Sequence, residues 1–289
     1  PAPPRRRGNA LEWSLANLLP RAPYAIAGTT FVTANLNVGG AQRSLTHLLG
    51  ALVGQWPIEL WVTHETVFDG FRATLAAVGI TPLQAASGEP FTAAAAIAER
   101  LATTRHRTLV FWNADPRLKL LLAKWLGPAV RIWDVSPGPA MPREMAEAAD
   151  FQQLIAFDVA GYLQRITGIV HKYAAAPLLG AVREPVIRNG VVVAPLPPAP
   201  ARPLHPVVLV LGRIHPAKHV LECIAAVAEL RVRHPSATLR IIGSAVALQR
   251  DYEAQVRAAA ISAQVTVHPP TSDVRNALAE ADLLLVLSS

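Results

Sequence analysis

The sequence has a single cysteine, Cys223, so it forms neither an internal disulfide nor a zinc site with four cysteines. No uncharged apolar run reaches the roughly 18–20 residues that a membrane span needs. Several catalytic motifs are missing: an Asp-x-Asp pair for a divalent cation, His-Glu-x-x-His, Gly-x-Ser-x-Gly and the Walker lysine loop. We therefore expect no metal and no cofactor, and any phosphate must be met by arginine, lysine and backbone N–H groups.

Lysine is scarce as well, so arginine supplies most of the formal net charge of +7. Such usage has two explanations: GC-rich coding, or attraction to polyanions or an anionic membrane surface. We favour the first, because the only dense basic run is Arg5-Arg6-Arg7 in a proline-rich leader. Nucleic-acid binding needs basic residues on one face with aromatic residues between them, so no nucleic-acid partner is expected.

The chain is long enough for more than one domain. Its 289 residues are 52% hydrophobic, which excludes disorder for the body of the chain, and roughly 100–200 residues per domain predicts two domains or one and a half. Because it starts at Pro1 and stops at Ser289 after an apolar run, we expect a fragment with an incomplete second domain. The predicted parts are a leader (1–23), a first domain (24–191), a proline-rich linker (192–206) and a second domain (207–289).

Short β-prone runs alternate with helical patterns, and this alternation with short links predicts parallel sheets covered on both faces. The expected strands are residues 30–34, 58–63, 80–83, 109–112, 130–134, 154–157, 186–187, 207–211, 238–242, 265–268 and 283–287. The expected helices are residues 41–52, 71–78, 91–102, 117–125, 141–149, 158–169, 217–234, 249–260 and 274–281, with Asp158 as an N-cap.

Two glycines, Gly39 and Gly40, stand between the first expected strand and the first expected helix. Glycine lets the backbone approach a ligand closely, and the N-terminus of the following helix favours an anion. The alternative is a tight turn without a ligand, because the full G-x-G-x-x-G pattern is absent.

A cationic segment, Gly212 to Lys218, directly follows the apolar run 207–211. Arg213 is therefore expected at the carboxyl edge of a parallel sheet, where ligands bind in open α/β folds. Together with Lys218 it can hold a diphosphate without a metal. The alternative is a solvated pair, which is less favourable because cations at a helix N-terminus repel its dipole unless an anion lies between them.

Asp134 lies in the expected polar loop 133–139, where it could accept a substrate hydroxyl or simply form an Asx turn. Asn189-Gly190, just before the linker, predicts a tight turn at a domain boundary.

Taken together, these segments resemble the retaining family 4 glycosyltransferases, which have the GT-B fold. The resemblance runs from about Thr33 to Ser289. Asn37–Leu45 is similar to the family's first glycine loop, Ile187–Val191 to its I-P-N-G-V strand, Leu211–Lys218 to its G-R-x-x-x-x-K donor loop, and Ala237–Gly243, Val265–Val267 and Asp273–Ser288 to its later segments.

The resemblance implies two Rossmann-like domains and transfer of a sugar from a nucleotide-diphosphate sugar, with retention of configuration, to a glycan, lipid-linked or small-molecule acceptor, as in polysaccharide biosynthesis. Arg213 and Lys218 would neutralise the departing diphosphate, and Asp134 would act on the acceptor side. The implied donor-binding residues are Gly39, Gly40, Gly212, Arg213, Lys218 and Gly243.

The chain departs from the family pattern at several positions. His219 and the run His268-Pro269-Pro270 stand where the family has glycines, and Asp134 occupies the neighbourhood of its first-domain histidine. The family's Glu-x7-Glu carboxylates, which contact the donor sugar and ribose, would follow Ser289. We therefore expect little or no transfer by this chain alone.

Two other functions stay open: a non-catalytic GT-B-like binding protein, suggested by the altered glycine positions, and another GT-B enzyme such as a sugar-nucleotide epimerase. The single cysteine suits a reducing compartment, so we expect a cytoplasmic protein. Its positive charge leaves open a peripheral contact with the inner face of the membrane.

Overall fold

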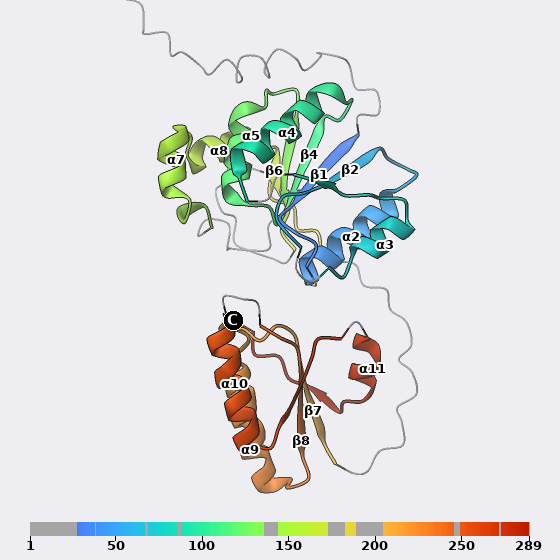
Figure 1. The fold of residues 1–289 in the computed structure, drawn as a ribbon, viewed down its shortest axis with the longest axis vertical. Coiled ribbons are helices and arrows are strands. Elements are labelled where there is room, and N and C mark those ends of the chain that lie inside the picture. The colour runs from blue at the N-terminus through green and yellow to red at the C-terminus, as the bar shows by residue number, and fades with distance from the viewer. Residues whose placement is uncertain are drawn as a thin grey trace, which may run out of the picture. The chain divides into compact units, whose positions relative to one another are not determined.

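The computed structural model describes residues 28–37, 39–66, 69–85, 88–135, 144–172, 183–188, 205–245, 249–271 and 273–288. The chain divides into two compact units, Pro1–Val191 and Val192–Ser289. The expected leader, most of the expected linker, and Asn189-Gly190 lie outside the described residues. Within the described ranges, each unit is a parallel sheet with helices on both faces, which confirms the α/β fold (Figure 1).

The first unit contains, in its described residues, a six-stranded sheet ordered β3-β2-β1-β4-β5-β6. Phe31 of β1 pairs with Leu60 of β2 on one side and with Val110 of β4 on the other. The chain moves outward from β1 to β3 and then from β4 to β6, so the strand order reverses between β1 and β4. The strands are β1 (Thr29–Thr33), β2 (Ile58–Val62), β3 (Leu83–Gln84), β4 (Thr108–Trp112), β5 (Arg131–Val135) and β6 (Gly168–Ile169).

Helices cover both faces of this sheet because side chains alternate along each strand. Phe31 packs into the core beneath α2 and α3, whereas the next residue, Val32, packs into the opposite core. Strands buried on both faces appear as nearly continuous apolar runs. The helices are α2 (Gly40–Leu52) and α3 (Arg72–Ala77) on one face, and α4 (Pro90–Thr103), α5 (Pro116–Trp125), α7 (Ala149–Ile155) and α8 (Val159–Arg165) on the other.

Three of these helices begin at acidic caps. The Glu89 carboxylate accepts hydrogen bonds from two backbone N–H groups at the start of α4, and Asp115 and Asp158 do the same for α5 and α8 with one each. Such caps satisfy donors that have no partner inside the helix. The Asp158 cap was expected from the sequence.

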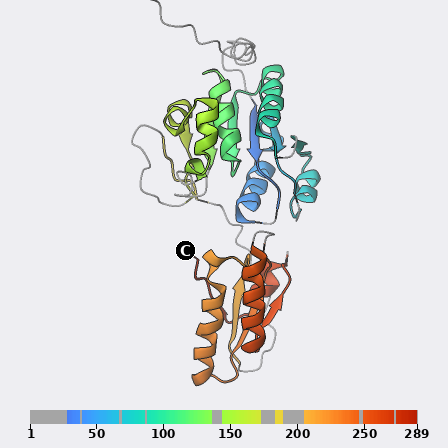
Figure 2. The ribbon, with the colours of Figure 1, turned by 60° about the vertical axis from the view of Figure 1, so that its left-hand side comes forward.

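The second unit contains, as far as it is described, a four-stranded sheet ordered β10-β7-β8-β9. Val208 and Val210 of β7 face the core formed with α9 and α10, whereas Leu209 faces α11 (Figure 1; Figure 2). The elements are β7 (Val207–Leu211), η1 (Pro216–Lys218), α9 (Val220–Arg233), β8 (Thr238–Ile242), α10 (Arg250–Ser262), β9 (Thr266–His268), α11 (Val274–Ala279) and β10 (Leu283–Leu284).

Two predictions in the first unit are wrong. Residues 154–157, predicted as a strand, form the end of α7 and the turn after it, where Ala156 has a left-handed φ of 48°. The predicted helix 158–169 ends at Arg165, and Gly168–Ile169 is strand β6. Both errors have one cause, since a short apolar run fits a strand and a buried helix equally well.

Further boundaries differ from the prediction, among them the end of β10, which is Leu284 instead of the expected residue 287. The expected helix 217–234 is divided into η1 and α9 at His219. Strand β3 lies later than residues 80–83, and Val186 forms only an isolated bridge with His171 instead of a strand.

Two glycines at the carboxyl edge of the second sheet allow a close approach of two backbones. Gly212 follows β7 and Gly243 follows β8, with φ values of 151° and 159°. A Cβ atom at Gly243 would lie 1.8 Å from the carbonyl oxygen of Gly212. Only glycine therefore fits at position 243.

Gly243→Ala is expected to destabilise the second unit by about 2–4 kcal/mol, through overpacking and backbone strain. Calorimetric unfolding of the whole chain measures the effect. The control is Gly50→Ala, because an added Cβ inside α2 meets no atom within 4 Å and is expected to stabilise by about 0.5–1 kcal/mol. Equal effects of the two variants would contradict the close packing of Gly243.

Candidate functional site

The second sheet reverses its strand order between β7 and β10. The chain proceeds from β7 through β8 to β9 on one side, and then returns to place β10 on the other side of β7. In open parallel sheets, ligands bind outside the carboxyl ends of the strands at such a reversal. The segments that leave these two ends are Gly212–Lys218 after β7 and the residues up to Ser288 after β10.

The segment after β7 is anchored at its hydrophobic residue and exposes its cations. Ile214 is buried, and its backbone N–H donates to the carbonyl of Ser244 at 3.0 Å. The flanking Arg213 side chain is exposed, and Lys218 at the end of η1 is half-buried. The structure thus places Arg213 and Lys218 on one short loop at the carboxyl edge, as the sequence predicted.

His215 lies between these two cations. Its Nδ1 accepts a hydrogen bond from the Ala217 backbone N–H at 3.1 Å and so caps η1. Burial lowers the pKa of His215, and the positive charges of Arg213 and Lys218 lower it further. The three side chains therefore form a positive cluster, with an imidazole that is neutral at pH 7 and accepts through Nδ1.

No carboxylate in the described part of the chain neutralises this cluster. Arg213 makes no hydrogen bond or ion pair with any described residue, and the Lys218 Nζ donates to a neutral partner, the Ser288 Oγ, at 2.9 Å. The nearby Glu222 is engaged by the Nδ1 of His219 at 3.2 Å. The Arg213 guanidinium and the remaining N–H groups of Lys218 therefore have no described acceptor, and such donors can bind an oxyanion.

His219, one of the predicted departures from a glycine, has a backbone conformation that favours glycine. Its φ of 50° and ψ of 44° are left-handed, and they separate η1 from α9. Such a conformation is routine for glycine and uncommon for other residues. His219 therefore occupies a position where glycine would fit without backbone strain.

The predicted glycines of the first unit lie at its own strand-order reversal, between β1 and β4. Gly39 caps α2 and Gly40 is its first residue, and the first turn of α2 contains no acidic side chain. A Cβ at Gly40 would meet no atom within 4 Å, so this backbone is open to a ligand. The loops after β1 and β4 are tied together by the Ala34 N–H, which donates to the Asn113 carbonyl.

The structure corrects the expectation for Asp134. This residue lies inside β5 rather than in a loop, and its side chain is 0% exposed. Both carboxylate oxygens accept from the Lys119 Nζ, at 3.0 and 3.1 Å, and the Tyr162 hydroxyl donates to Oδ2 at 2.6 Å. Burial, followed by the negative charge of Asp134, raises the pKa of Tyr162. A buried, partnered carboxylate offers no oxygen to a substrate, so Asp134 has a structural role.

Sequence analysis missed a second polar group at the carboxyl edge of the first sheet. His64 follows β2, shares a hydrogen bond of 3.1 Å with the Thr63 hydroxyl, and lies 3.5 Å from the Asp115 carboxylate. Lys172, after β6, places its ammonium 4.3 Å from the ring centre of Trp112. The signal available in the sequence for His64 was its position at the end of the expected strand 58–63, where polar residues face the ligand edge, whereas Lys172 followed a segment predicted as a helix.

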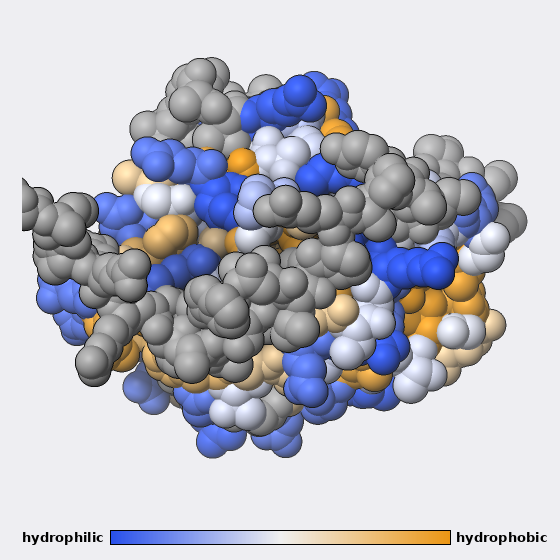
Figure 3. All heavy atoms as spheres, turned by 90° about the horizontal axis from the view of Figure 1, so that it is seen from above, coloured by the Kyte–Doolittle hydropathy of each residue, from blue (hydrophilic) through white to orange (hydrophobic). Residues whose placement is uncertain are grey.

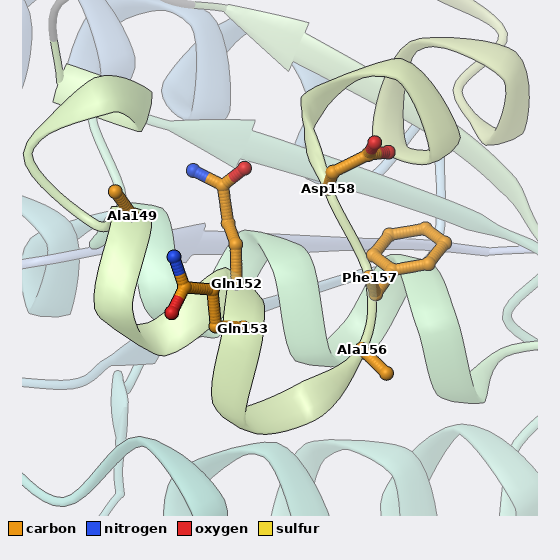
Figure 4. A pocket seen from close by; sticks show the side chains of 6 residues that line it. All are labelled: Ala149, Gln152, Gln153, Ala156, Phe157 and Asp158. Carbon is orange, nitrogen blue, oxygen red and sulfur yellow. The ribbon is translucent and has the colours of Figure 1, made fainter.

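One pocket lies away from both edges, between α7 and α8. Its lining residues include Gln152, Gln153 and Phe157 (Figure 4). The Gln152 amide is already used within the fold, because its Nε2 donates to Met145 and its Oε1 accepts from the Val159 N–H. The Asp158 carboxylate, which also lines the pocket, caps α8 through the Gly161 N–H, so both of these polar side chains have partners within the fold.

In the view of Figure 3, hydrophobic residues lie beside hydrophilic ones over the part of the surface that is coloured by hydropathy. The most exposed apolar side chains, Leu154, Val232 and Ile261, come from three different helices. Among the described residues, no helix has the length and apolar character needed to cross a bilayer. The same residues contain no group of three or more potential metal-ligating His, Cys, Asp or Glu side chains.

Comparison with solved structures defines the class of fold. A crystal structure of Anabaena HepE with UDP and glucose aligns with 91% of this chain and 74% of its own, at a TM-score of 0.65 and 14% identity. A glycosyltransferase from Rickettsia africae aligns with 90% of this chain and 73% of its own (TM-score 0.58, 14% identity). The lipopolysaccharide outer core galactosyltransferase WaaB aligns over the same shares of the two chains (TM-score 0.56, 15% identity). The chain therefore has the GT-B fold of glycosyltransferases.

The sequence match is confined to the second unit. Residues 205–289 match the family model described as glycosyl transferases group 1, a range that includes the cationic loop. No curated protein sequence matches the chain.

Lys119→Met is expected to destabilise the first unit by about 3–5 kcal/mol, because it removes the ammonium that donates to both oxygens of the buried Asp134 carboxylate. All tryptophans lie in the first unit, so their fluorescence during urea unfolding reports on that unit alone.

The double variant Lys119→Met/Asp134→Asn removes both charges and is expected to recover part of the loss. A single variant as stable as the wild type would contradict the buried ion pair.

Proposed function

We propose that this protein is a retaining glycosyltransferase that uses a nucleotide-diphosphate sugar, and that the loop after β7 binds the diphosphate of the donor. The observation that carries the proposal is the pair of cations, Arg213 and Lys218, at a strand-order reversal without a carboxylate partner among the described residues. A diphosphate supplies the missing negative charge.

Two comparisons support this proposal. The family match covers the cationic loop, and the HepE structures hold UDP, UDP with glucose, or UDP-glucose. A uridine nucleotide is therefore the first donor to test. The sugar that this chain would transfer does not follow from the likeness.

The proposed chemistry is electrostatic. As the bond from the sugar to the diphosphate breaks, negative charge grows on the departing phosphate oxygens. Fixed guanidinium and ammonium groups stabilise that charge more in the transition state than in the ground state. The cations perform this task without a divalent metal in the proposed mechanism. Gly212 and Gly243 give the loop its close backbone approach, and Gly39 and Gly40 remain proposed contacts of donor or acceptor.

The two alternative functions make different predictions. A binding protein of the same fold would hold the nucleotide sugar without consuming it, and an epimerase would convert it without an acceptor. Product analysis with a nucleotide sugar, in the presence and absence of candidate glycan or lipid-linked acceptors, identifies an epimerase by conversion without an acceptor, and any glycosylated acceptor excludes the binding protein. A cytoplasmic location with peripheral membrane contact is part of the proposal.

Arg213→Ala and Lys218→Met are each expected to weaken UDP binding about 10- to 100-fold, because a hydrogen bond between charged groups contributes about 1.5–3 kcal/mol. Isothermal titration calorimetry with the whole chain measures the effect. The matched control is Arg233→Ala, an exposed arginine at the opposite end of α9, which is expected to bind as the wild type does. Unchanged binding in both loop variants would refute the proposed site.

Saturating UDP is expected to raise the pKa of His215. In the free protein, the positive charges of Arg213 and Lys218 add to burial in lowering it, and a bound diphosphate offsets those charges. Imidazole NMR resonances followed from pH 4.5 to 8 measure the change, with His234, at the other end of α9, as internal control. A titration of His215 that does not respond to bound UDP would place the phosphates elsewhere.

A further inference from the structure

One hydrogen bond connects the two segments that flank the strand-order reversal of the second sheet. The Lys218 Nζ, after β7, donates to the Ser288 Oγ, after β10, at 2.9 Å. These residues are 70 positions apart in the sequence. The contact depends on the pairing of β10 with β7, in which Leu283 lies beside Val208.

Lys218 and Ser288 have more hydrogen-bond donors than acceptors among the described residues. A lysine ammonium has three N–H donors and no acceptor, and a serine hydroxyl has one donor and two acceptor lone pairs. Since Ser288 accepts from Lys218, its own O–H proton stays available, and so do two protons of the ammonium. No described residue accepts from either group. The adjacent Arg213 adds further unused donors.

We propose that Ser288 is an anion-binding residue that acts together with Lys218: its oxygen orients the ammonium, and its O–H donates to the same phosphate group. This inference rests on the proposed function, because it assigns a further residue to the same diphosphate site. Orientation matters because a lysine side chain loses up to about 2 kcal/mol of rotamer entropy when it is fixed. The bond to Ser288 fixes part of that freedom before the anion binds.

With Ser288 included, the segments after β7 and after β10 both contribute to one site. Arg213 and Lys218 come from the loop after β7, and Ser288 comes from the segment after β10. A phosphate held by all three would be contacted from both sides of the crevice, which is the usual position of ligands in open parallel sheets.

Calorimetric binding of inorganic pyrophosphate and of UDP to the whole chain, in a buffer free of phosphate, tests the proposal. Ser288→Ala is expected to bind both ligands about 5- to 10-fold more weakly. Ser288→Thr keeps the hydroxyl and is expected to stay within about 2-fold of the wild type. The control is Ser236→Ala, an exposed serine in the turn before β8 at the opposite edge of the sheet, which is expected to leave binding unchanged.

A double-mutant cycle separates joint action from independent contacts. In the Lys218→Met background, Ser288→Ala is expected to weaken binding by only about 2-fold, because the ammonium that the serine orients is gone. Fully additive losses would overturn the joint action of the pair. Wild-type affinity in Ser288→Ala would overturn the role of the serine, while the effects of Arg213→Ala and Lys218→Met would still uphold the proposed function. If the wild-type chain binds neither ligand, both proposals fail.

Discussion

The candidate site depends on one constraint, which is that Arg213 and Lys218 share a short loop beside His215 without a carboxylate partner among the described residues. The fold holds two cations close enough to lower the pKa of the histidine between them, and it places no carboxylate beside them in the described residues. Gly243 packs its backbone against Gly212, so the loop leaves β7 in a tight turn that a larger side chain would prevent. A bound oxyanion turns this unfavourable arrangement into a favourable one, which is how a site for charged ligands differs from an ordinary surface pair.

The two units use charged side chains in opposite ways. In the first, Lys119 and Asp134 are fully buried against each other and Tyr162 donates to the same carboxylate, so these contacts connect α5, β5 and α8. In the second, Lys218 donates to the neutral Ser288 hydroxyl and Arg213 is exposed, although other arginines of this unit, such as Arg257 with Glu253, form ion pairs. Burial and partner, rather than residue type, therefore distinguish a structural lysine from one that is available to a ligand.

Much of the fold followed from the sequence, because most strands are apolar runs between clear turn signals. β7 and β8 agree with their predicted ranges, 207–211 and 238–242. Predictions failed at α7 and β6, where the apolar runs are too short for their period to distinguish a helix from a strand.

The cationic loop was found because a glycine and an arginine directly follow a strand. Asp134 was misassigned because the strand continues two residues beyond the predicted loop start, and alternation then directs its side chain into the core. Ser288 was beyond the reach of sequence reasoning, since its contact with Lys218 exists only once β10 pairs with β7.

The most direct test of the central claim is a crystal structure of this chain with UDP. The account predicts electron density for the two phosphates within hydrogen-bonding distance of the Arg213 guanidinium and the Lys218 ammonium, at the carboxyl ends of β7 and β10. Phosphate density at any other place on the second unit, with both cations still directed toward solvent, would contradict it.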